Sequence, residues 1–143
     1  TINAFNKQLY RVLAGSANDE IIYAINVSGA YNMSDNIAFS GGNGASINTA
    51  TGAAVAANTD YVVTAYYDGT NLSVQLNNGT ATTAACALSA GTAAITFGKD
   101  NGAASGFSNG REYQTIYLKN VTKSAGEIAS ANSYVAAKCG VTL

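Results

Sequence analysis

Histidine and tryptophan are absent from this 143-residue chain, and it has only two cysteines, Cys86 and Cys139. Neither lies in a Cys-x-x-Cys pair, so the usual zinc ligand sets cannot be assembled. A zinc site and a Cys/His nucleophile are therefore excluded. Two arrangements remain open for the cysteines. They form one disulfide, which would contribute roughly 4 kcal/mol by closing a long loop, or they are separate thiols that pack as small apolar residues.

Charge is also scarce, because charged residues make up only 10% of the chain, against about 25% in ordinary globular proteins. The net charge is −1, and no stretch gathers lysine or arginine. Binding to nucleic acid or to an anionic membrane depends on such a basic patch. No apolar run approaches the roughly 20 residues that span a bilayer. We therefore expect neither nucleic-acid binding nor membrane insertion, and a polar surface made of Asn, Ser, Thr and Gly.

The chain is long enough for one domain, residues 1–143, that buries about two-thirds of its unfolded surface. Much of it alternates with period two between Gly, Asn and Ser turns, which is typical of short strands. The clearest hairpin joins Tyr61–Tyr67 to Leu72–Leu76 through Asp68-Gly69-Thr70-Asn71. Further strands are predicted at 8–14, 20–27, 36–39, 46–48, 94–98 and 112–118. Strand or loop is predicted at 81–90, loop and edge strand at 50–57, and loops at 41–44 and 99–109.

One helix is predicted at the C-terminal end. Ser124 and Glu127 have the spacing of a capping box, in which each side chain accepts from a free backbone N–H. Apolar residues then recur at helical spacing, and Gly140 stands where a left-handed cap ends a helix. This apolar stripe consists of Ile128, Ala131, Val135 and Cys139. Many short strands with a single helix indicate an all-β fold with a helical appendage.

Several motifs follow one another in a fixed order in the C-terminal half. They are Tyr67-Asp68-Gly69, Leu76-Asn77-Asn78-Gly79, Ile95-Thr96-Phe97-Gly98, Phe107-Ser108-Asn109-Gly110 and the helix end Tyr134-Val135-Ala136-Ala137-Lys138-Cys139-Gly140. In this order they resemble the concanavalin A-like lectin/glucanase superfamily, and within it the laminin-G-like domains found in phage virion and bacterial surface proteins. The chain departs from the family pattern at Tyr61, where a tryptophan is usual, and at Cys139, where a second tyrosine is usual.

The resemblance implies an antiparallel jelly-roll β-sandwich with one short C-terminal helix. Domains of this type usually begin with a further strand. We therefore expect the sheet to be minimal, or to be completed by upstream sequence or by another chain. The resemblance also allows glycan hydrolysis, because some members of the wider fold are glucanases or lyases.

The acidic residues argue against that activity. Glycan hydrolysis needs two carboxyl groups that face each other across the sugar. The acids of this chain form no Glu-x-Asp-x-x-Glu strand, and Glu127 is explained by its helix cap and Asp68 by its turn. We therefore expect a protein that is not an enzyme, and a glycan hydrolase or lyase is the least favoured interpretation.

The loop from Asp100 to Arg111 is the best candidate for a binding site, because loops at one end of a scaffold often carry function. Its polar groups gather around an aromatic ring, an arrangement suited to sugars. The candidate ligand-binding residues are Asp100, Asn101, Phe107, Asn109, Arg111 and Tyr113. The tyrosines Tyr66, Tyr113 and Tyr117 can stack a sugar if their face is open; otherwise they pack in the core or at its rim.

Calcium is common in the wider family that the chain resembles. Asp100, Asn101 and Asn109 offer oxygen ligands, and Asp68 can add one from a neighbouring turn. With so few carboxylates the site would be weak, and the alternative is that all four are turn residues. No other metal or cofactor is expected.

The composition favours a structural function. The chain has no proline, little charge and much Ala, Gly, Asn and Thr, which is typical of exposed virion or surface-layer proteins. A surface with little charge can be buried between copies at small desolvation cost. We expect a non-catalytic structural or adhesion module, extracellular or on a virion surface, whose partners are copies of itself, other virion or surface proteins, and cell-surface glycans. The alternative is a calcium-dependent secreted lectin or a carbohydrate-binding module of a larger enzyme.

Overall fold

The computed structural model describes residues 7–12, 20–25, 36–42, 46–56, 59–88, 95–97, 114, 116 and 123–143. In these ranges the chain forms, in order, β1 (Lys7–Val12), β2 (Glu20–Ile25), β3 (Asn36–Gly42), β4 (Ile47–Ala54), β5 (Val63–Tyr67), β6 (Asn71–Leu76), β7 (Thr82–Ala85), β8 (Ile95–Phe97) and α1 (Ala125–Cys139). The predicted loop at 99–109 lies outside the described residues, and the predicted strand at 112–118 is described only at Gln114 and Ile116.

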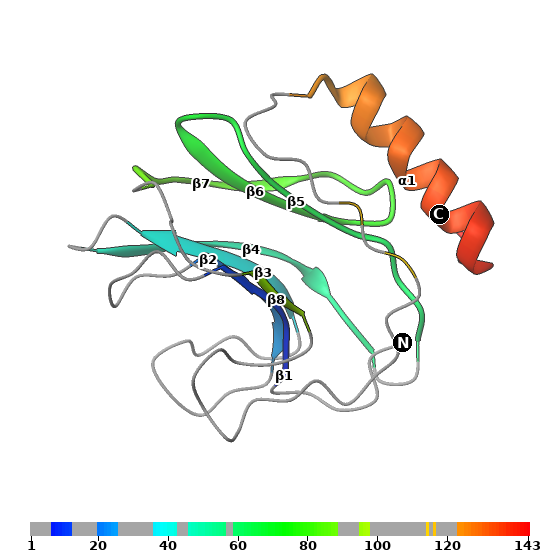
Figure 1. The fold of residues 1–143 in the computed structure, drawn as a ribbon, viewed down its shortest axis with the longest axis horizontal. Helices are drawn as coiled ribbons and strands as arrows, with labels where there is room; N and C mark the ends of the chain where they lie inside the picture. Colours follow the sequence, from blue (N-terminus) through cyan, green and yellow to red (C-terminus); the bar gives the residue numbers. More distant parts are fainter. Residues whose placement is uncertain are drawn as a thin grey trace.

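The strands belong to two antiparallel sheets. Among the described strands, one sheet has five in the order β4-β3-β2-β1-β8 and the other has three in the order β5-β6-β7. Every neighbouring pair runs antiparallel. The sheets lie one over the other, and α1 lies beyond the three-stranded sheet, on the side away from the five-stranded one (Figure 1). The prediction of an all-β fold with one C-terminal helix is confirmed.

Two strands differ from the sequence prediction. β3 continues through Gly41 and Gly42, which were predicted as loop. β4 is one strand of eight residues, where a short strand at 46–48 and a separate stretch of loop and edge strand at 50–57 were predicted. Both differences have one cause, since β3 and β4 pair along this whole stretch, with Gly41 opposite Asn48 and Gly42 opposite Ile47. Pairing and burial in the sheet outweigh the low strand propensity of glycine.

The main core lies between β3 and β4 of one sheet and β6 of the other. Ile37, Leu72 and Val74 are fully buried here, and burying each such side chain contributes about 1.5–3 kcal/mol. The buried cluster comprises Ile37, Phe39, Ala50, Val55, Leu72, Val74, Leu76 and Cys86. The predicted apolar face of β6 is therefore confirmed.

Both faces of β3 are closed. Ile37 and Phe39 belong to the main core, and Ala38 and Ser40, at the alternate positions of the strand, are also fully buried. The Ser40 and Thr49 hydroxyl oxygens lie 2.6 Å apart and share a hydrogen bond between β3 and β4. At β3, the sheet face that points away from the core therefore offers no open platform for a ligand.

Gly52 in β4 marks a close approach of the two sheets. A Cβ atom at this position would lie 2.8 Å from Ile37 Cγ2 and 3.2 Å from Val74 Cγ1. Ile37 belongs to β3 and Val74 to β6, so the glycine makes room for side chains of both sheets. The β3–β4 register shifts beside it, between Asn36 and Ala38, and Asn36 Nδ2 donates a hydrogen bond to the Gly52 carbonyl at 2.8 Å.

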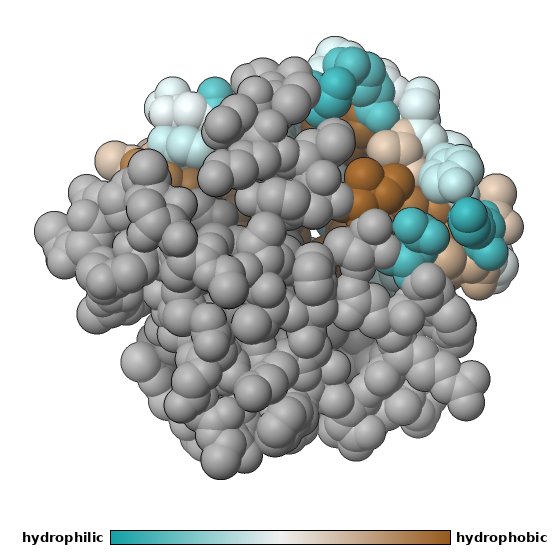
Figure 2. Space-filling view, viewed as in Figure 1, coloured by the Kyte–Doolittle hydropathy of each residue, from teal (hydrophilic) through white to brown (hydrophobic). Residues whose placement is uncertain are grey.

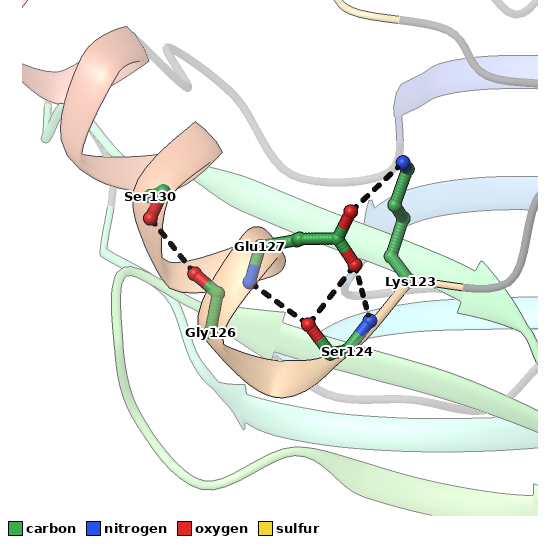
Figure 3. A network of polar contacts seen from close by, with 5 residues as sticks. All are labelled: Lys123, Ser124, Gly126, Glu127 and Ser130. Atoms are coloured by element: carbon green, nitrogen blue, oxygen red, sulfur yellow. Dashed lines mark hydrogen bonds and ion pairs between the residues drawn. The ribbon is translucent and has the colours of Figure 1, made fainter.

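The ends of α1 confirm the predicted caps. Ser124 Oγ accepts from the Glu127 N–H at 3.3 Å, and Glu127 Oε2 accepts from the Ser124 N–H at 2.9 Å. Lys123 Nζ lies 3.1 Å from Glu127 Oε1 (Figure 3). The Ser124 N–H, together with Lys123, lowers the pKa of Glu127 to about 2. Gly140 ends the helix in the left-handed conformation with φ of 71°.

Asn132 anchors α1 to the three-stranded sheet. The predicted stripe of Ile128, Ala131, Val135 and Cys139 is only half-buried, and the most buried helix residues are Asn132 and Ala136. The most buried face of α1 is therefore shifted by one residue from the predicted stripe. An apolar pattern could not reveal the displacement, because the residue at its centre is polar.

The Asn132 amide makes its hydrogen bonds to β5 and to the β6–β7 turn. Its Oδ1 accepts from Thr64 Oγ1 at 2.6 Å, and its Nδ2 donates to the Asn77 carbonyl at 3.1 Å and to Asn78 Oδ1 at 3.2 Å. Asn77 adopts φ of 53°, a left-handed conformation that asparagine tolerates better than most residues. Its own side chain accepts from the Val62 N–H at 3.0 Å, which fixes the turn that receives the helix.

The two cysteines are free thiols in the structure. Cys86 is buried, and its Sγ lies 3.3 Å from the Gly41 carbonyl oxygen. Cys139 is half-buried at the last position of α1. Of the two arrangements that the sequence left open, the structure has the separate thiols and not the disulfide.

We predict that Gly52→Ala lowers the free energy of unfolding by about 1–3 kcal/mol. The added methyl meets Ile37 Cγ2, and the branched isoleucine side chain is stiff and fully buried. Gly126→Ala is the matched control, because a Cβ there meets nothing within 4 Å. Urea unfolding monitored by circular dichroism measures both, and equal midpoints for Gly52→Ala and the parent would contradict the close approach.

Asn132→Ala should also destabilise the fold, by about 1–3 kcal/mol, since it removes a buried amide that makes three hydrogen bonds to β5 and the β6–β7 turn. Amide exchange in α1 should accelerate more than exchange in β6. Ser133→Ala, at the exposed neighbouring position, is the control and should change stability little. An Asn132→Ala variant as stable as Ser133→Ala would show that the helix is held by its apolar contacts alone.

Candidate functional site

The site residues predicted from the sequence are not among those that the structure describes. Asp100, Asn101, Phe107, Asn109, Arg111 and Tyr113 all lie outside the described residues, as does Tyr117. Tyr66 is described and is half-buried in β5. Its neighbours Ala65 and Tyr67 pack against the core, so Tyr66 belongs to the opposite face of the strand. On that same face Thr64 receives α1.

The turn between β5 and β6 is built around the Asp68 carboxylate. Asp68 Oδ1 accepts from the Asn71 N–H at 2.7 Å and from the Thr70 N–H at 2.8 Å, and Oδ2 accepts from Asn71 Nδ2 at 3.3 Å. These donors, the Asn71 N–H first, hold the pKa of Asp68 below its ordinary value. Gly69 takes the left-handed position with φ of 100°. Asp68 therefore acts as a turn residue, with both carboxylate oxygens already accepting hydrogen bonds.

The Tyr67 hydroxyl ties this turn to the segment that follows β7. It donates to the Gly69 carbonyl at 2.8 Å and lies 3.0 Å from the Cys86 carbonyl, and the Leu88 N–H approaches it at 3.5 Å. The Cys86 N–H in turn donates to the Thr70 carbonyl at 2.9 Å. Because the Tyr67 ring packs against the core, one side chain links the core, the turn and the end of β7.

The residues of these contacts also line a shallow pocket, which we call the end pocket. Its volume is about 540 Å³, within the range of sites for small ligands. The pocket is lined by Ser46, Asn48, Tyr67, Gly69, Thr70, Ala85, Cys86, Ala87 and Leu88. It lies where the start of β4, the β5–β6 turn and the end of β7 meet.

The chemistry of the end pocket is neutral. Among the described residues that line it, none has a charged side chain. Ser46, Asn48 and Thr70 supply hydroxyl and amide groups, and Ala87 and Leu88 supply an apolar wall. This arrangement can bind an uncharged ligand that carries both hydroxyl groups and apolar carbons. The sequence contained one signal for it, the Tyr67-Asp68-Gly69 turn, but Ser46 and Ala87 lie far from that turn along the chain.

Metal-binding and membrane-spanning features were sought in the same parts of the chain. Within the described ranges, no three His, Cys, Asp or Glu side chains gather in a way that could hold a metal ion. In those ranges there is also no helix with the length and apolarity needed to cross a membrane. The end pocket is therefore the candidate site that the described residues provide.

Comparisons of the chain with protein-family models, with curated proteins and with solved structures gave no match. The candidate site is therefore argued from the positions and chemistry of its residues alone.

Tyr67→Phe tests the hydroxyl at the rear of the pocket. It removes the hydrogen bond to the Gly69 carbonyl and the contact with the Cys86 carbonyl, so we expect a loss of about 0.5–1.5 kcal/mol of unfolding free energy. Tyr66→Phe is the control on the same strand, because the Tyr66 hydroxyl makes no hydrogen bond to the described part of the chain. Urea unfolding of the two variants should separate them, and equal stability would refute the structural role of the Tyr67 hydroxyl.

Proposed function

We propose that this chain is a non-catalytic structural and adhesion module, displayed on a virion or cell surface, whose end pocket binds a neutral glycan. The observation that carries the proposal is the uncharged pocket where the two sheets meet at the β5–β6 turn. The proposal includes the finer fold, a laminin-G-like jelly-roll β-sandwich, which the order of the sequence motifs favours.

The pocket suits a sugar because sugars combine hydroxyl groups with apolar ring carbons. Asn48 can both donate to and accept from a hydroxyl group, and Thr70 can do the same. Ala87 and Leu88 provide a surface for the ring carbons. The described lining residues carry no charge, so they offer an acidic sugar no ion pair to offset the cost of burying its carboxylate, whereas an uncharged sugar pays no such cost.

Two of the described carboxylates, Asp68 and Glu127, lack the environment of a glycosidase acid. Asp68 and Glu127 both have lowered pKa values, because backbone N–H groups donate to them. The hydrogen bonds of the β5–β6 turn keep Asp68 ionised, and those of the helix cap keep Glu127 ionised. A glycosidase needs one carboxyl group with a raised pKa as general acid, which is the opposite environment.

The surface supports display in an assembly. Charged residues make up 10% of the chain, and among the coloured residues of Figure 2 hydrophobic and weakly polar ones lie beside hydrophilic ones. Such a surface can meet copies of itself or other surface proteins at low desolvation cost. Calcium is not needed for this function.

A glycan array probed with and without calcium tests the proposal. We expect binding to uncharged glycans, equal in both conditions. Ala87→Trp fills the end pocket from an exposed position and should abolish binding, whereas Ala129→Trp, at an exposed position of α1, should leave it unchanged. Circular dichroism shows whether each variant is folded.

Three results would overturn the proposal. Absence of binding in both conditions would remove the adhesion function, and loss of binding on calcium removal would favour a calcium-dependent lectin. Release of reducing sugar from polysaccharides by the purified chain would remove the non-catalytic assignment.

A further inference from the structure

The β6–β7 turn carries an asparagine followed by a glycine. Asn78 and Gly79 are both exposed, and the Gly79 N–H donates to the Leu76 carbonyl at 2.9 Å. Asparagine is a thermolabile residue. It is most labile before glycine, because no side chain then screens the next backbone nitrogen. The turn therefore combines a labile amide, an unscreened nucleophile and access to water.

The reaction open to this pair is deamidation through a succinimide. The Gly79 nitrogen attacks Asn78 Cγ, a new C–N bond forms, and Nδ2 leaves as ammonia with the proton that the Gly79 nitrogen gives up. Water then opens the ring. Opening at Cγ gives aspartate, and opening at the backbone carbonyl gives isoaspartate, in which the main chain runs through the side chain of residue 78. Water is consumed, ammonia is released, and no other reagent is needed.

Two hydrogen bonds oppose ring closure in the folded chain. The bond from the Gly79 N–H to the Leu76 carbonyl keeps the proton on the attacking nitrogen. Asn78 Oδ1 accepts from Asn132 Nδ2 at 3.2 Å, which holds the side-chain amide at the helix. Ring closure requires this amide to turn toward the Gly79 nitrogen, so both bonds have to open.

The second of these bonds belongs to the anchor of α1. The Asn132 side chain is buried, and its amide also bonds the Asn77 carbonyl and Thr64 Oγ1. Leaving a buried polar group unpaired is costly, so release of Asn78 is coupled to release of the helix from the sheet. Such local openings are a general property of folded proteins. The docking of α1 therefore controls how often the turn can react.

We infer that Asn78 is a deamidation site that the docking of α1 keeps closed. The amide survives while the helix is docked, and each local opening of α1 gives the turn an opportunity to react. The inference goes beyond the proposed function and does not depend on glycan binding. The end pocket lies at the β5–β6 turn, whereas Asn78 follows the opposite end of β6.

The reaction changes the anchor permanently. Either product adds one negative charge to a chain whose net charge is −1. Aspartate keeps an oxygen that can accept from Asn132. Isoaspartate lengthens the main chain between Asn77 and Gly79 and displaces the Asn77 carbonyl, the other acceptor of the Asn132 Nδ2 group. Isoaspartate at this position therefore loosens α1.

The test is the rate of deamidation at residue 78, followed by peptide mapping with mass spectrometry during incubation at mildly alkaline pH. Mapping is required because Asn43, Asn101 and Asn109 also precede glycine and lie outside the described residues. The folded parent chain should react at Asn78 about tenfold more slowly than the same chain in urea, a factor that corresponds to about 1.4 kcal/mol in favour of the closed turn.

Three variants isolate the contribution of the helix. Asn132→Ala should react several-fold faster than the parent at Asn78. Ser133→Ala, at an exposed position of the same helix, should react at the parent rate. Thr64→Val removes the hydroxyl that donates to Asn132 and leaves the turn unchanged, so it serves if Asn132→Ala does not fold, and it should also react faster than the parent. Circular dichroism reports whether each variant is folded.

Three results would overturn the inference. Equal rates in the folded and the unfolded parent would show that the fold gives no protection. Folded Asn132→Ala and Thr64→Val variants no faster than Ser133→Ala would show that the turn is protected without the helix. Absence of aspartate and isoaspartate at residue 78 even in urea would remove the site itself. Glycan binding is measured separately on the fresh chain, so none of these results touches the proposed function.

Discussion

The close contact of Ile37 and Val74 beside Gly52 is the constraint on which the two-sheet core depends. Because a Cβ at Gly52 would lie 2.8 Å from Ile37, any larger residue at this point would push β4 away from Ile37 and Val74 and weaken the packing of the two sheets. The β3–β4 register shifts between Asn36 and Ala38, beside this glycine, and Asn36 donates a hydrogen bond to the Gly52 carbonyl. The end pocket depends on the close contact indirectly, because β4 supplies one wall of the pocket and the segment after β7 supplies another.

Amide and hydroxyl groups hold the outer parts to this core. Tyr67 links the β5–β6 turn to Cys86, and Asn132 links α1 to β5 and to the β6–β7 turn. In the described part of the chain, the hydrogen bonds that the Asp68 and Glu127 carboxylates make in the β5–β6 turn and in the cap of α1 join residues that are close together in the sequence. In a chain with 10% charged residues, neutral side chains thus make the hydrogen bonds that join these distant elements, and the described residues that line the end pocket are uncharged.

Local patterns in the sequence predicted the local structure well. The Ser124–Glu127 capping box, Gly140 and the β5–β6 hairpin all depend on residues close together in the chain, and the structure has each of them. The extent of β3 and β4 was not predictable, because Gly41, Gly42 and Gly52 are turn formers that become strand only through pairing with distant residues. Nor was the anchor at Asn132, since its partners, such as Thr64, are far away in sequence.

The candidate site was also hard to predict, because its residues are far apart in the sequence. Tyr67-Asp68-Gly69 was recognised as a turn, but Ser46 and Ala87 join it only in the fold.

The central claim of the account is that the end pocket binds a neutral glycan. The most direct measurement is a titration of the isotope-labelled chain with an uncharged oligosaccharide, followed by NMR. The account predicts that the amide signals of Asn48, Thr70 and Ala87 shift together and saturably. Saturable shifts confined to α1, or no shift in these three signals while the glycan binds, would contradict it.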